Sequence, residues 1–521
     1  MRRIHASGLA AIGPLLVTVL LAGCGGTVDV PSADEERTAA YFESIRNSAA
    51  QARAFLERMP KGGDIHNHLS GAVMAESYIR WAAEAQYCVQ VATFTLTAPP
   101  CNPAAGVPLV SEAVHDPAFY DQLLDALSMR NFVPGAETGH DHFFATFTKF
   151  NAISSIKTGD MLAEVAARWQ AEQVSYLELL LSLRGGSGAR TLVNDVPWDI
   201  SKVQDILNLL LTNPLFAGYI ADARSELDAD EARMRSVLGC GTSTADPACG
   251  EGMTLRYIYQ VSRMLPPVQV FATAVFGAEL AAADPRVVGI NLVAPEDGPV
   301  ALSDYVTHME IIAFVAMAIP GVHVSLHAGE LTPEFAPDED LRFHIRAAVE
   351  VAQASRIGHG VDLMWENGWP QLTEEMADRR TLVEICLSSN DFILGIRGPA
   401  HPFDTYRAQG VPLTLATDDA GISRIDLTHE YQRATDAYDL HYGDLKTLAR
   451  NSLEYGFLPG KSLWQITVPF VITDECAGDS PAAVHTSRRC RDLLDGSKHA
   501  WQQWRLEADF ASFERTIAVS P

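Results

Sequence analysis

The chain has 521 residues, of which 47% are hydrophobic, and a formal net charge of −26 at pH 7. A chain of this length and apolar content can bury a large core, and an α/β barrel with insertions uses such a length as one unit. A surface this acidic repels phosphate backbones, so we expect no nucleic-acid partner, and it makes a phosphorylated substrate less favoured than a neutral one. The interpretation we prefer for the charge itself is that it keeps the protein in solution.

Residues 1–24 are predicted to be a targeting segment. Two arginines precede an apolar stretch, from about residue 9 to residue 21, that is short and broken for a transmembrane helix and has the layout of a secretory signal. It ends in Leu-Ala-Gly-Cys, which resembles the lipobox of bacterial lipoproteins, and this makes Cys24 the expected lipidation site. We therefore expect an exported protein, in the bacterial periplasm or at the outer membrane or cell surface, that meets a membrane through its lipid anchor only. The alternative is ordinary cleavage with Cys24 incidental.

Residues 25–33 are small and polar and are predicted to form a tether. Apolar residues then recur at helical spacing over 34–59, which predicts one N-terminal helix, with Ser32 and Glu35 as a capping box at its start. The default expectation is that this helix packs on its own barrel. The alternative is packing against a second subunit, in a homodimer.

Residues 60–521 are predicted to fold as an α/β protein, a TIM-type (β/α)8 barrel with helical insertions. Short apolar segments alternate with helical stretches, which favours a parallel sheet, and eight such segments are the number that closes this barrel. Two long gaps, near 70–173 and 185–253, are predicted insertions, and the chain end is a predicted helical extension. The expected strands are 64–68, 174–183, 254–262, 287–293, 322–327, 356–359, 382–388 and 411–417, and the helical stretches include 159–172, 302–319, 341–353, 371–379 and 427–465.

Six cysteines fall into local pairs within polar sequence that contains glycine or proline. Three short-range disulfides are their simplest pairing in an oxidising compartment, which agrees with export. Cys386 lies in an apolar run and is expected to be a buried free thiol. The sequence has no Cys-x-x-Cys, so we expect no cysteine zinc site. The expected pairs are Cys88–Cys101, Cys240–Cys249 and Cys476–Cys490.

Histidines and carboxylates fall at the carboxyl ends of four predicted strands. Residues two apart in a strand point the same way, and the carboxyl ends of barrel strands face one cavity. Each motif alone is weak, since a His-x-His is more often a pair of surface histidines and an Asp-Asp is more often a solvated turn. Their joint placement favours a shared metal site. The residues are His66, His68, His327, Glu330, His359, Asp418 and Asp419.

Three histidine nitrogens and one carboxylate oxygen suit zinc, with a bound water completing a catalytic site. Binuclear hydrolases of this barrel type usually carry a bridging lysine after the fourth strand, and 287–293 and the residues just after it have none, which favours a single metal. We expect one Zn²⁺ per chain, held by His66, His68, His327 and Asp418.

Three further residues are placed to act on a substrate. Glu330 stands three residues past a predicted ligand and is expected to be a general acid and base. His359 is expected to hold or polarise the attacking water, and Asp419 to point at the substrate.

The stretch Met59–Ala72 and four shorter pieces resemble the adenosine deaminase family. The pieces follow the family's order between about residues 59 and 460. The Met-Pro-Lys-Gly lead-in, the helix before it and the exported layout are similar to the secreted adenosine deaminase growth-factor subgroup. The shorter pieces are His-Ala-Gly-Glu at 327–330, Gly-His-Gly at 358–360, Cys-Leu-Ser-Ser-Asn at 386–390 and Thr-Asp-Asp at 417–419.

The resemblance implies a zinc-dependent conversion of adenosine or deoxyadenosine to inosine and ammonia. By the same resemblance, Glu330 protonates N1 of the purine as hydroxide attacks C6, and His359 and Asp418 orient the hydroxide. Asp419 hydrogen-bonds N7. The resemblance also implies that His66, His68, His327 and Asp418 are the zinc ligands.

Two positions depart from the family pattern. Ser70 stands where classical members carry an acid that touches the ribose, and Ala294 stands where the family often has a glycine whose amide meets N3. Both changes bear on nucleoside selectivity. The alternatives are a deaminase or amidohydrolase acting on another aminated purine or heterocycle, and a non-catalytic nucleoside-binding protein on the same scaffold.

Aromatic residues at 143, 144 and 147 beside His140 and His142 have two interpretations of equal weight. They form part of a substrate lid, or they are an ordinary apolar helix face with two surface histidines.

Overall fold

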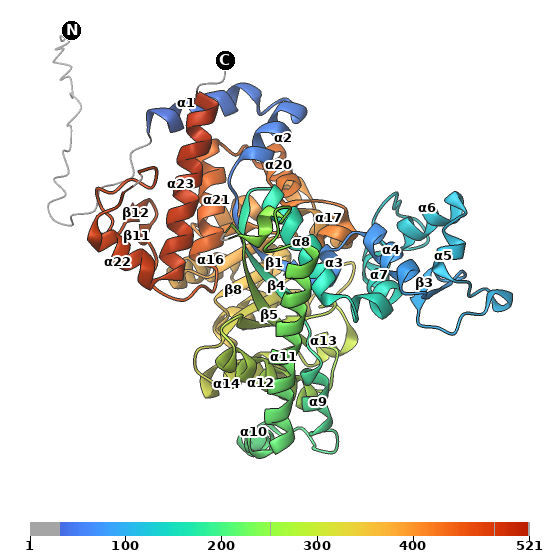
Figure 1. Ribbon diagram of the computed structural model, residues 1–521. Coiled ribbons are helices and arrows are strands. Elements are labelled where there is room, and N and C mark those ends of the chain that lie inside the picture. The colour runs from blue at the N-terminus through green and yellow to red at the C-terminus, as the bar shows by residue number, and fades with distance from the viewer. Residues whose placement is uncertain (1–31, 251, 484, 519–521) are drawn as a thin grey trace, which may run out of the picture.

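The computed structural model describes residues 32–250, 252–483 and 485–518 (Figure 1). The predicted signal segment, Cys24 and the tether up to residue 31 lie outside the described residues. Eight parallel strands form one sheet in the order β1-β4-β5-β6-β7-β8-β9-β10. The strands are β1 (Gly62–His68), β4 (Val174–Leu181), β5 (Thr254–Ser262), β6 (Val287–Val293), β7 (His323–Ala328), β8 (Arg356–His359), β9 (Leu382–Ile385) and β10 (Leu413–Leu415).

The sheet closes into a barrel where β1 meets the end of β10. The Asp418 amide donates to the His66 carbonyl at 3.0 Å, and the His68 amide donates to the Asp418 carbonyl at 3.1 Å. Asp64 fastens the same seam, because its carboxylate accepts hydrogen bonds from Thr417 and from the Trp169 indole. The predicted TIM-type barrel is therefore confirmed, and its seam lies at the predicted metal site.

Apolar side chains fill the barrel wall, and charges cross its centre. All eight residues of β4 are buried, as expected for a parallel strand covered on both faces. Inside the barrel, the buried Arg356 contacts Glu178 and Glu384, each at 2.6 Å. Buried charges need partners of this kind, because each ion has lost its hydration. The helices after the strands include α8 (Thr158–Ala171), α12 (Pro267–Ala283), α14 (Tyr305–Ala318), α15 (His344–Glu350), α16 (Trp369–Arg379), α18 (Phe403–Ala408), α20 (Leu427–Tyr438) and α21 (Tyr442–Glu454).

Both long gaps hold the expected helical insertions, and the first also holds a hairpin that was not expected. The first insertion extends to one side in Figure 1 and the second extends below the barrel. The hairpin of the first insertion pairs Cys88 with Thr97, and the Cys88–Cys101 disulfide fastens this hairpin. The elements of the first are α3 (Leu69–Ala72), α4 (Ala75–Glu84), β2 (Cys88–Gln90), β3 (Thr95–Thr97), α5 (Val110–Ala113), α6 (Pro117–Ala126) and α7 (Gly139–Ser154), and those of the second are α9 (Gly185–Thr191), α10 (Val203–Thr212) and α11 (Pro214–Val237).

The segment predicted as one N-terminal helix is two helices, α1 (Ala33–Ile45) and α2 (Ala49–Arg58). The break falls at Asn47 and Ser48, whose side chains compete for backbone hydrogen bonds and favour turns and caps. Both helices pack on the same chain, α1 on α23 (Lys498–Ala518) and α2 on α20. The buried Lys61 ties this segment to the barrel, since its ammonium donates to the carbonyls of Leu56, Met59 and Glu172.

The C-terminal extension was predicted to be helical, but it is only partly helical. Between α21 and the last helices lies a two-stranded hairpin, β11 (Trp464–Thr467) with β12 (Phe470–Ile472), followed by α22 (Arg488–Gly496) and α23 (Lys498–Ala518). Trp464 and Phe470 pack edge to face at 5.0 Å and bury the hairpin with the Cys476–Cys490 disulfide. An aromatic cross-strand pair of this kind favours strand over helix.

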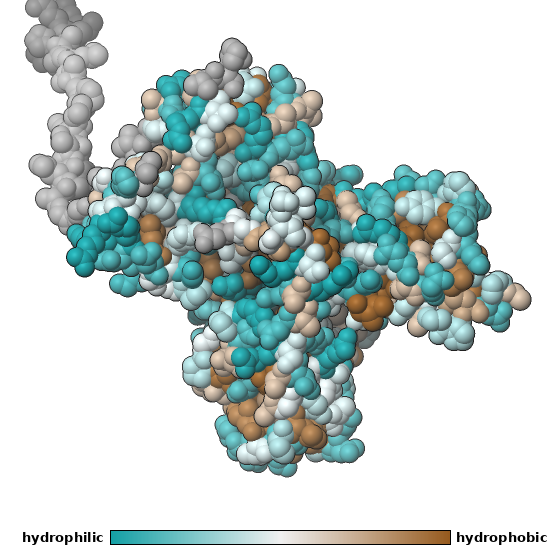
Figure 2. Space-filling model, in the orientation of Figure 1, coloured by the Kyte–Doolittle hydropathy of each residue, from teal (hydrophilic) through white to brown (hydrophobic). Residues whose placement is uncertain are grey.

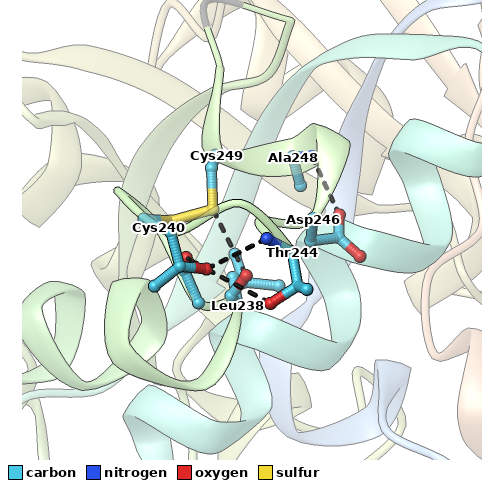
Figure 3. Close-up of a disulfide and its surroundings, with 8 residues drawn as sticks. Leu238, Cys240, Thr244, Asp246, Ala248 and Cys249 are labelled. Carbon is cyan, nitrogen blue, oxygen red and sulfur yellow. Dashed lines mark hydrogen bonds between the residues drawn. A yellow bond between two sulfur atoms is a disulfide. The ribbon is translucent and has the colours of Figure 1, made fainter.

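All three expected disulfides are present among the described residues, and Cys386 is a buried free thiol. Figure 3 shows the Cys240–Cys249 bond at the end of the second insertion, where Asp246 caps the turn by accepting the Ala248 amide at 2.8 Å. The disulfide fastens this turn beside the C-terminal end of α11, shortly before the chain re-enters the barrel at β5.

The visible surface is mostly hydrophilic, with apolar side chains gathered around α10, α12 and α14 (Figure 2). Leu209, Leu211 and Leu215 are among the exposed apolar residues there. Among the helices that the structure describes, none is by itself long and apolar enough to cross a bilayer. The segments 200–212 and 214–237 meet that test only together, across a bend of 66°.

Candidate active site

Four donor atoms from three strand ends converge at the mouth of the barrel. The Nε2 atoms of His66 and His68 each lie 3.1 Å from Nε2 of His327. Oδ1 of Asp418 lies 3.6 Å from the first and 3.4 Å from the second. Two ligands of a tetrahedral zinc, each at its usual bond length, are about 3.3 Å apart. The donor set and its spacing therefore fit one zinc-sized ion, and the predicted ligands are brought together.

Each of these donors is held from behind by a second polar group. Glu384 contacts Nδ1 of His66 at 2.5 Å, the side-chain amide of Gln260 contacts Nδ1 of His68 at 2.9 Å, and Asn291 contacts Nδ1 of His327 at 2.8 Å. The Ser389 hydroxyl donates to Oδ2 of Asp418 at 2.6 Å. Such partners fix ring orientation and tautomer at metal sites.

Sequence reasoning missed these four supporting residues. Glu384, Gln260 and Asn291 are single polar residues within apolar strands, and such residues carry no periodic signal of their own. The signal that was available is the lone buried-strand carboxylate or amide, which must find a partner when the strand is covered on both faces.

The backbone at the site is locally strained. His359 has φ +72° and Asp418 has φ +57°, values that residues with a Cβ rarely adopt. Strain of this kind gathers at functional sites. Two motif glycines are needed for space: a Cβ on Gly71 would lie 1.5 Å from the Asp419 carboxylate, and one on Gly358 would lie 2.5 Å from the His66 ring.

Three groups beside the donor set keep a free polar atom. Among the described residues, Nε2 of His359, Oε1 of Glu330 and Oδ1 of Asp419 are buried and have no hydrogen-bond partner. The Asn390 amide donates to Nδ1 of His359 at 2.9 Å, so the neutral ring carries its proton on Nε2. Burial lowers the pKa of His359 to about 4, which keeps the ring neutral at pH 7.

The two free carboxyl groups are electrostatically unlike Asp418. Burial, and then the negative charge of Asp418, raises the pKa values of Glu330 and Asp419 well above their usual range. Burial opposes ionisation of Asp418 too, but His66, His359 and His68 hold its pKa well below the usual range. Environments that separate the pKa values of neighbouring carboxyl groups in this way leave Asp418 ionised and leave Glu330 and Asp419 able to donate a proton.

The donor set opens into a cavity of about 380 Å³. Phe143, Phe144 and Phe147 of α7 line it, which supports the lid interpretation. His140 and His142 are not surface residues, since their side chains are only 13% and 12% exposed. The predicted substrate-binding positions Asp419, Ser70 and Ala294 all line the same cavity, together with Gln260, Val293, Pro295 and Ile393.

A parallel eight-stranded barrel with histidine and aspartate donors at its carboxyl-terminal mouth defines a class, the metal-dependent hydrolase barrels. A statistical model of the family described as adenosine deaminase matches residues 220–467. Adenine deaminase from Rhizobium rhizogenes is 28% identical over 214 residues, a match that covers 40% of this chain and 59% of that protein. Within residues 220–467, this chain therefore resembles the adenosine deaminase family. It spans 59% of the length of this curated relative.

Solved structures show the same fold. An amidohydrolase from Burkholderia ambifaria with bound zinc superposes with a TM-score of 0.51 at 16% identity, covering 91% of this chain and 96% of that one. The Arabidopsis protein ADAL, solved in complex with GMP, superposes with a TM-score of 0.50 at 19% identity, covering 78% and 94%.

Proposed function

We propose that this protein catalyses the hydrolytic, zinc-dependent deamination of adenosine or deoxyadenosine to inosine or deoxyinosine and ammonia. The observation that carries the proposal is the set of unsatisfied atoms on Glu330, His359 and Asp419, buried beside four donor atoms spaced for one zinc ion. Polar atoms in such surroundings are costly unless a ligand meets them. The intact set argues against a binding protein that has lost its catalytic residues.

His66, His68, His327 and Asp418 are the residues that would hold the zinc. When bound, zinc supplies hydroxide near neutral pH by lowering the pKa of water. Glu330, protonated because of its burial, delivers a proton to N1 of the purine. His359 donates from Nε2 and orients the nucleophile toward C6, and Asp419 hydrogen-bonds N7. The ionised Glu330 then takes the proton of the hydroxyl added at C6 and passes it to the amino group, which leaves as ammonia and gives the 6-oxo product. A new water molecule restores the proton on Glu330 and the hydroxide.

The substrate is proposed to be a nucleoside because the cavity extends beyond the space beside the donor set. Ser70 and Gln260 line both the first cavity and a second one of about 400 Å³. The second cavity is also lined by the amide side chain of Asn151 and by the hydroxyl side chains of Ser154 and Thr158. These groups can form hydrogen bonds with the hydroxyl groups of a sugar.

Free adenine is the second candidate, because curated relatives are adenine deaminases. Steady-state kinetics on adenosine, 2′-deoxyadenosine, adenine and AMP distinguish the two. The AMP arm is included because the structurally similar ADAL was solved with GMP. We expect kcat/KM for the nucleosides to exceed that for adenine and AMP by at least tenfold. A preference for adenine would transfer the proposal to the free base, and no turnover of any purine would reject it.

We also propose that the protein is exported and anchored through a lipid on Cys24. The three disulfides support export, because such bonds persist in oxidising compartments. In cells fed labelled palmitate, the full-length protein should take up label and partition with membranes. The Cys24→Ala variant should do neither, and equal labelling of both would reject the anchor.

A further inference from the structure

The geometry points to Glu296 as a positioning residue for the proton-carrying Glu330, an inference that rests on the proposed function. Glu296 follows β6 and is 1% exposed. Its carboxylate does not line the cavity, so it acts through the backbone of the turn that carries Glu330.

The Glu296 carboxylate accepts the backbone amides of the catalytic turn. Oε2 accepts the Glu330 amide at 2.9 Å, and Oε1 accepts the Gly329 amide at 3.1 Å. The turn follows β7 and leads into a stretch without a helix until residue 340, and Gly329 has φ +74°. Buried amides at such a turn need an acceptor from outside the local backbone, and Glu296 supplies it.

The carbonyl side of the same turn is fixed by Arg263. Its Nη2 donates to the carbonyl of His327 at 2.8 Å and to that of Leu292 at 2.9 Å. Nη1 of Arg263 lies 3.7 Å from Oε2 of Glu296, so one buried ion pair spans the turn. The segment from a metal ligand to the general acid is therefore held at both ends.

His344 fixes Glu296 in turn. Its Nδ1 contacts Oε1 of Glu296 at 2.7 Å, and its ring stacks on Tyr305 with centroids 3.5 Å apart. A proton carrier must lie within a few tenths of an ångström of its productive position, and residues locked by packing provide that precision. The negative charge of Glu296 also contributes, after burial and Asp418, to the raised pKa of Glu330.

Glu296→Gln keeps the shape of the side chain but leaves one of the two amides without an acceptor. We expect kcat on adenosine to fall by about 10–100-fold, because a shift of the Glu330 carboxyl group by about 1 Å has an effect of that size. KM should change by less than about threefold. Zinc content should stay at one per chain. The alkaline limb of the kcat profile should move to lower pH, because Glu330 loses a neighbouring negative charge and gives up its proton more readily.

Glu507→Gln is the matched control. Glu507 is a buried carboxylate on α23 that contacts Arg450 at 2.7 Å outside the cavity. The Glu507→Gln variant should have a lower melting temperature than the wild type, with the same kcat and the same pH profile of kcat. If Glu296→Gln behaves like this control, or loses zinc, Glu296 is structural only and the inference is overturned.

Hydrogen exchange tests the inference independently of substrate. In Glu296→Gln the amides of residues 329 and 330 should exchange at least tenfold faster than in the wild type, with the rest of the barrel unchanged. A wild type that deaminates no purine rejects the proposed function, yet the exchange result still decides whether Glu296 holds this turn. Unchanged protection overturns the inference; Glu296→Ala repeats the measurement with both acceptors removed.

Discussion

At the scale of single residues, each donor side chain of the metal site is set by the group behind it. Glu384 shows this most clearly. It contacts His66 with one oxygen and Arg356 with the other, so the same carboxylate orients a metal ligand and neutralises a buried cation. A substitution of Glu384 should therefore change the affinity for zinc more than the affinity for substrate.

Glu384→Gln should weaken zinc binding by about 10–100-fold, the usual effect of losing a partner behind a metal-bound histidine. Breaking the buried pair with Arg356 should also lower the free energy of unfolding by about 3–5 kcal/mol. Competition with a zinc chelator measures the first effect and urea unfolding the second. Glu507→Gln is again the control, and zinc affinity equal in both variants would contradict the assigned role.

Ala294 lines the cavity with φ +85°, a conformation suited to glycine. Relief of about 1 kcal/mol of strain in Ala294→Gly should offset the greater entropy of glycine in the unfolded chain, about 0.5–1 kcal/mol, so stability should hardly change. Ala313→Gly within α14 should cost about 1 kcal/mol, because no strain is relieved there. Equal losses in urea unfolding for the two variants would show that residue 294 is unstrained.

The residues predicted from the sequence are those that stand at strand ends in motifs, such as His66, His327 and Asp418. Their partners were not predicted, because Gln260, Asn291 and Glu384 become neighbours of those motifs only through the register of the barrel. Glu296 was visible merely as part of the segment after β6. Its role depends on which amides face it, and a sequence carries no sign of that.

At the scale of elements, we interpret α7, which lines the cavity, as a lid that His140 ties to the barrel rim. His140 near its start contacts Oδ1 of Asp297 at 3.0 Å and Asp141 at 3.1 Å, and its ring stacks on Phe335. Asp297 belongs to the segment after β6, so this contact ties the lid to the rim of the barrel. The lid should therefore loosen when the contact is lost.

Protection of α7 against hydrogen exchange should fall as the pH rises from about 6 to about 9, after correction for intrinsic rates. Burial lowers the pKa of His140, but Asp297 and Asp141 outweigh it, and the net shift is upward. The stabilising contribution is thus complete below the ordinary histidine pKa and is lost as the pH rises through the raised one. Asp297→Asn should remove this pH dependence. If the protection of α7 depends on pH equally in the variant and in the wild type, the contact between His140 and Asp297 is not the cause of the pH dependence.

All eight strands were predicted, but their exact ends, the split of the N-terminal helix and the two hairpins β2–β3 and β11–β12 were not. Continuous apolar runs identify buried strands, whereas the last residues of a run, as at 386–388, turn into the next helix where the barrel rim needs a sharp turn. The N-terminal pair of helices and the β11–β12 hairpin were missed because turn-forming residues such as Ser48, and a local aromatic pair, override a helical pattern.

At the scale of the whole molecule, the metal site and the barrel seam coincide. Backbone hydrogen bonds between Asp418 and β1 close the barrel, and Asp418 is also one of the proposed zinc ligands. A bound ion would therefore join the first strand to the last. A ligand that binds only the folded state stabilises it by about 2.7 kcal/mol at a free concentration 100 times its Kd.

Removal of zinc should consequently lower the melting temperature by several degrees and raise exchange at the β1–β10 seam. Calorimetry with and without a chelator gives the first value. Asp418→Ala, which lacks one donor, should show no response to the chelator. A wild type whose melting temperature is the same in both conditions would contradict a metal at the seam.

The most direct test of the account is the conversion of adenosine by purified protein lacking residues 1–24, followed by purine absorbance, with and without zinc and beside Glu330→Gln. We expect inosine to form at a rate proportional to bound zinc, and the Glu330→Gln rate to fall by at least 100-fold while its zinc content is unchanged. No turnover with one zinc bound per chain, or full activity of Glu330→Gln, would contradict the assignment of the cavity as an adenosine deaminase site.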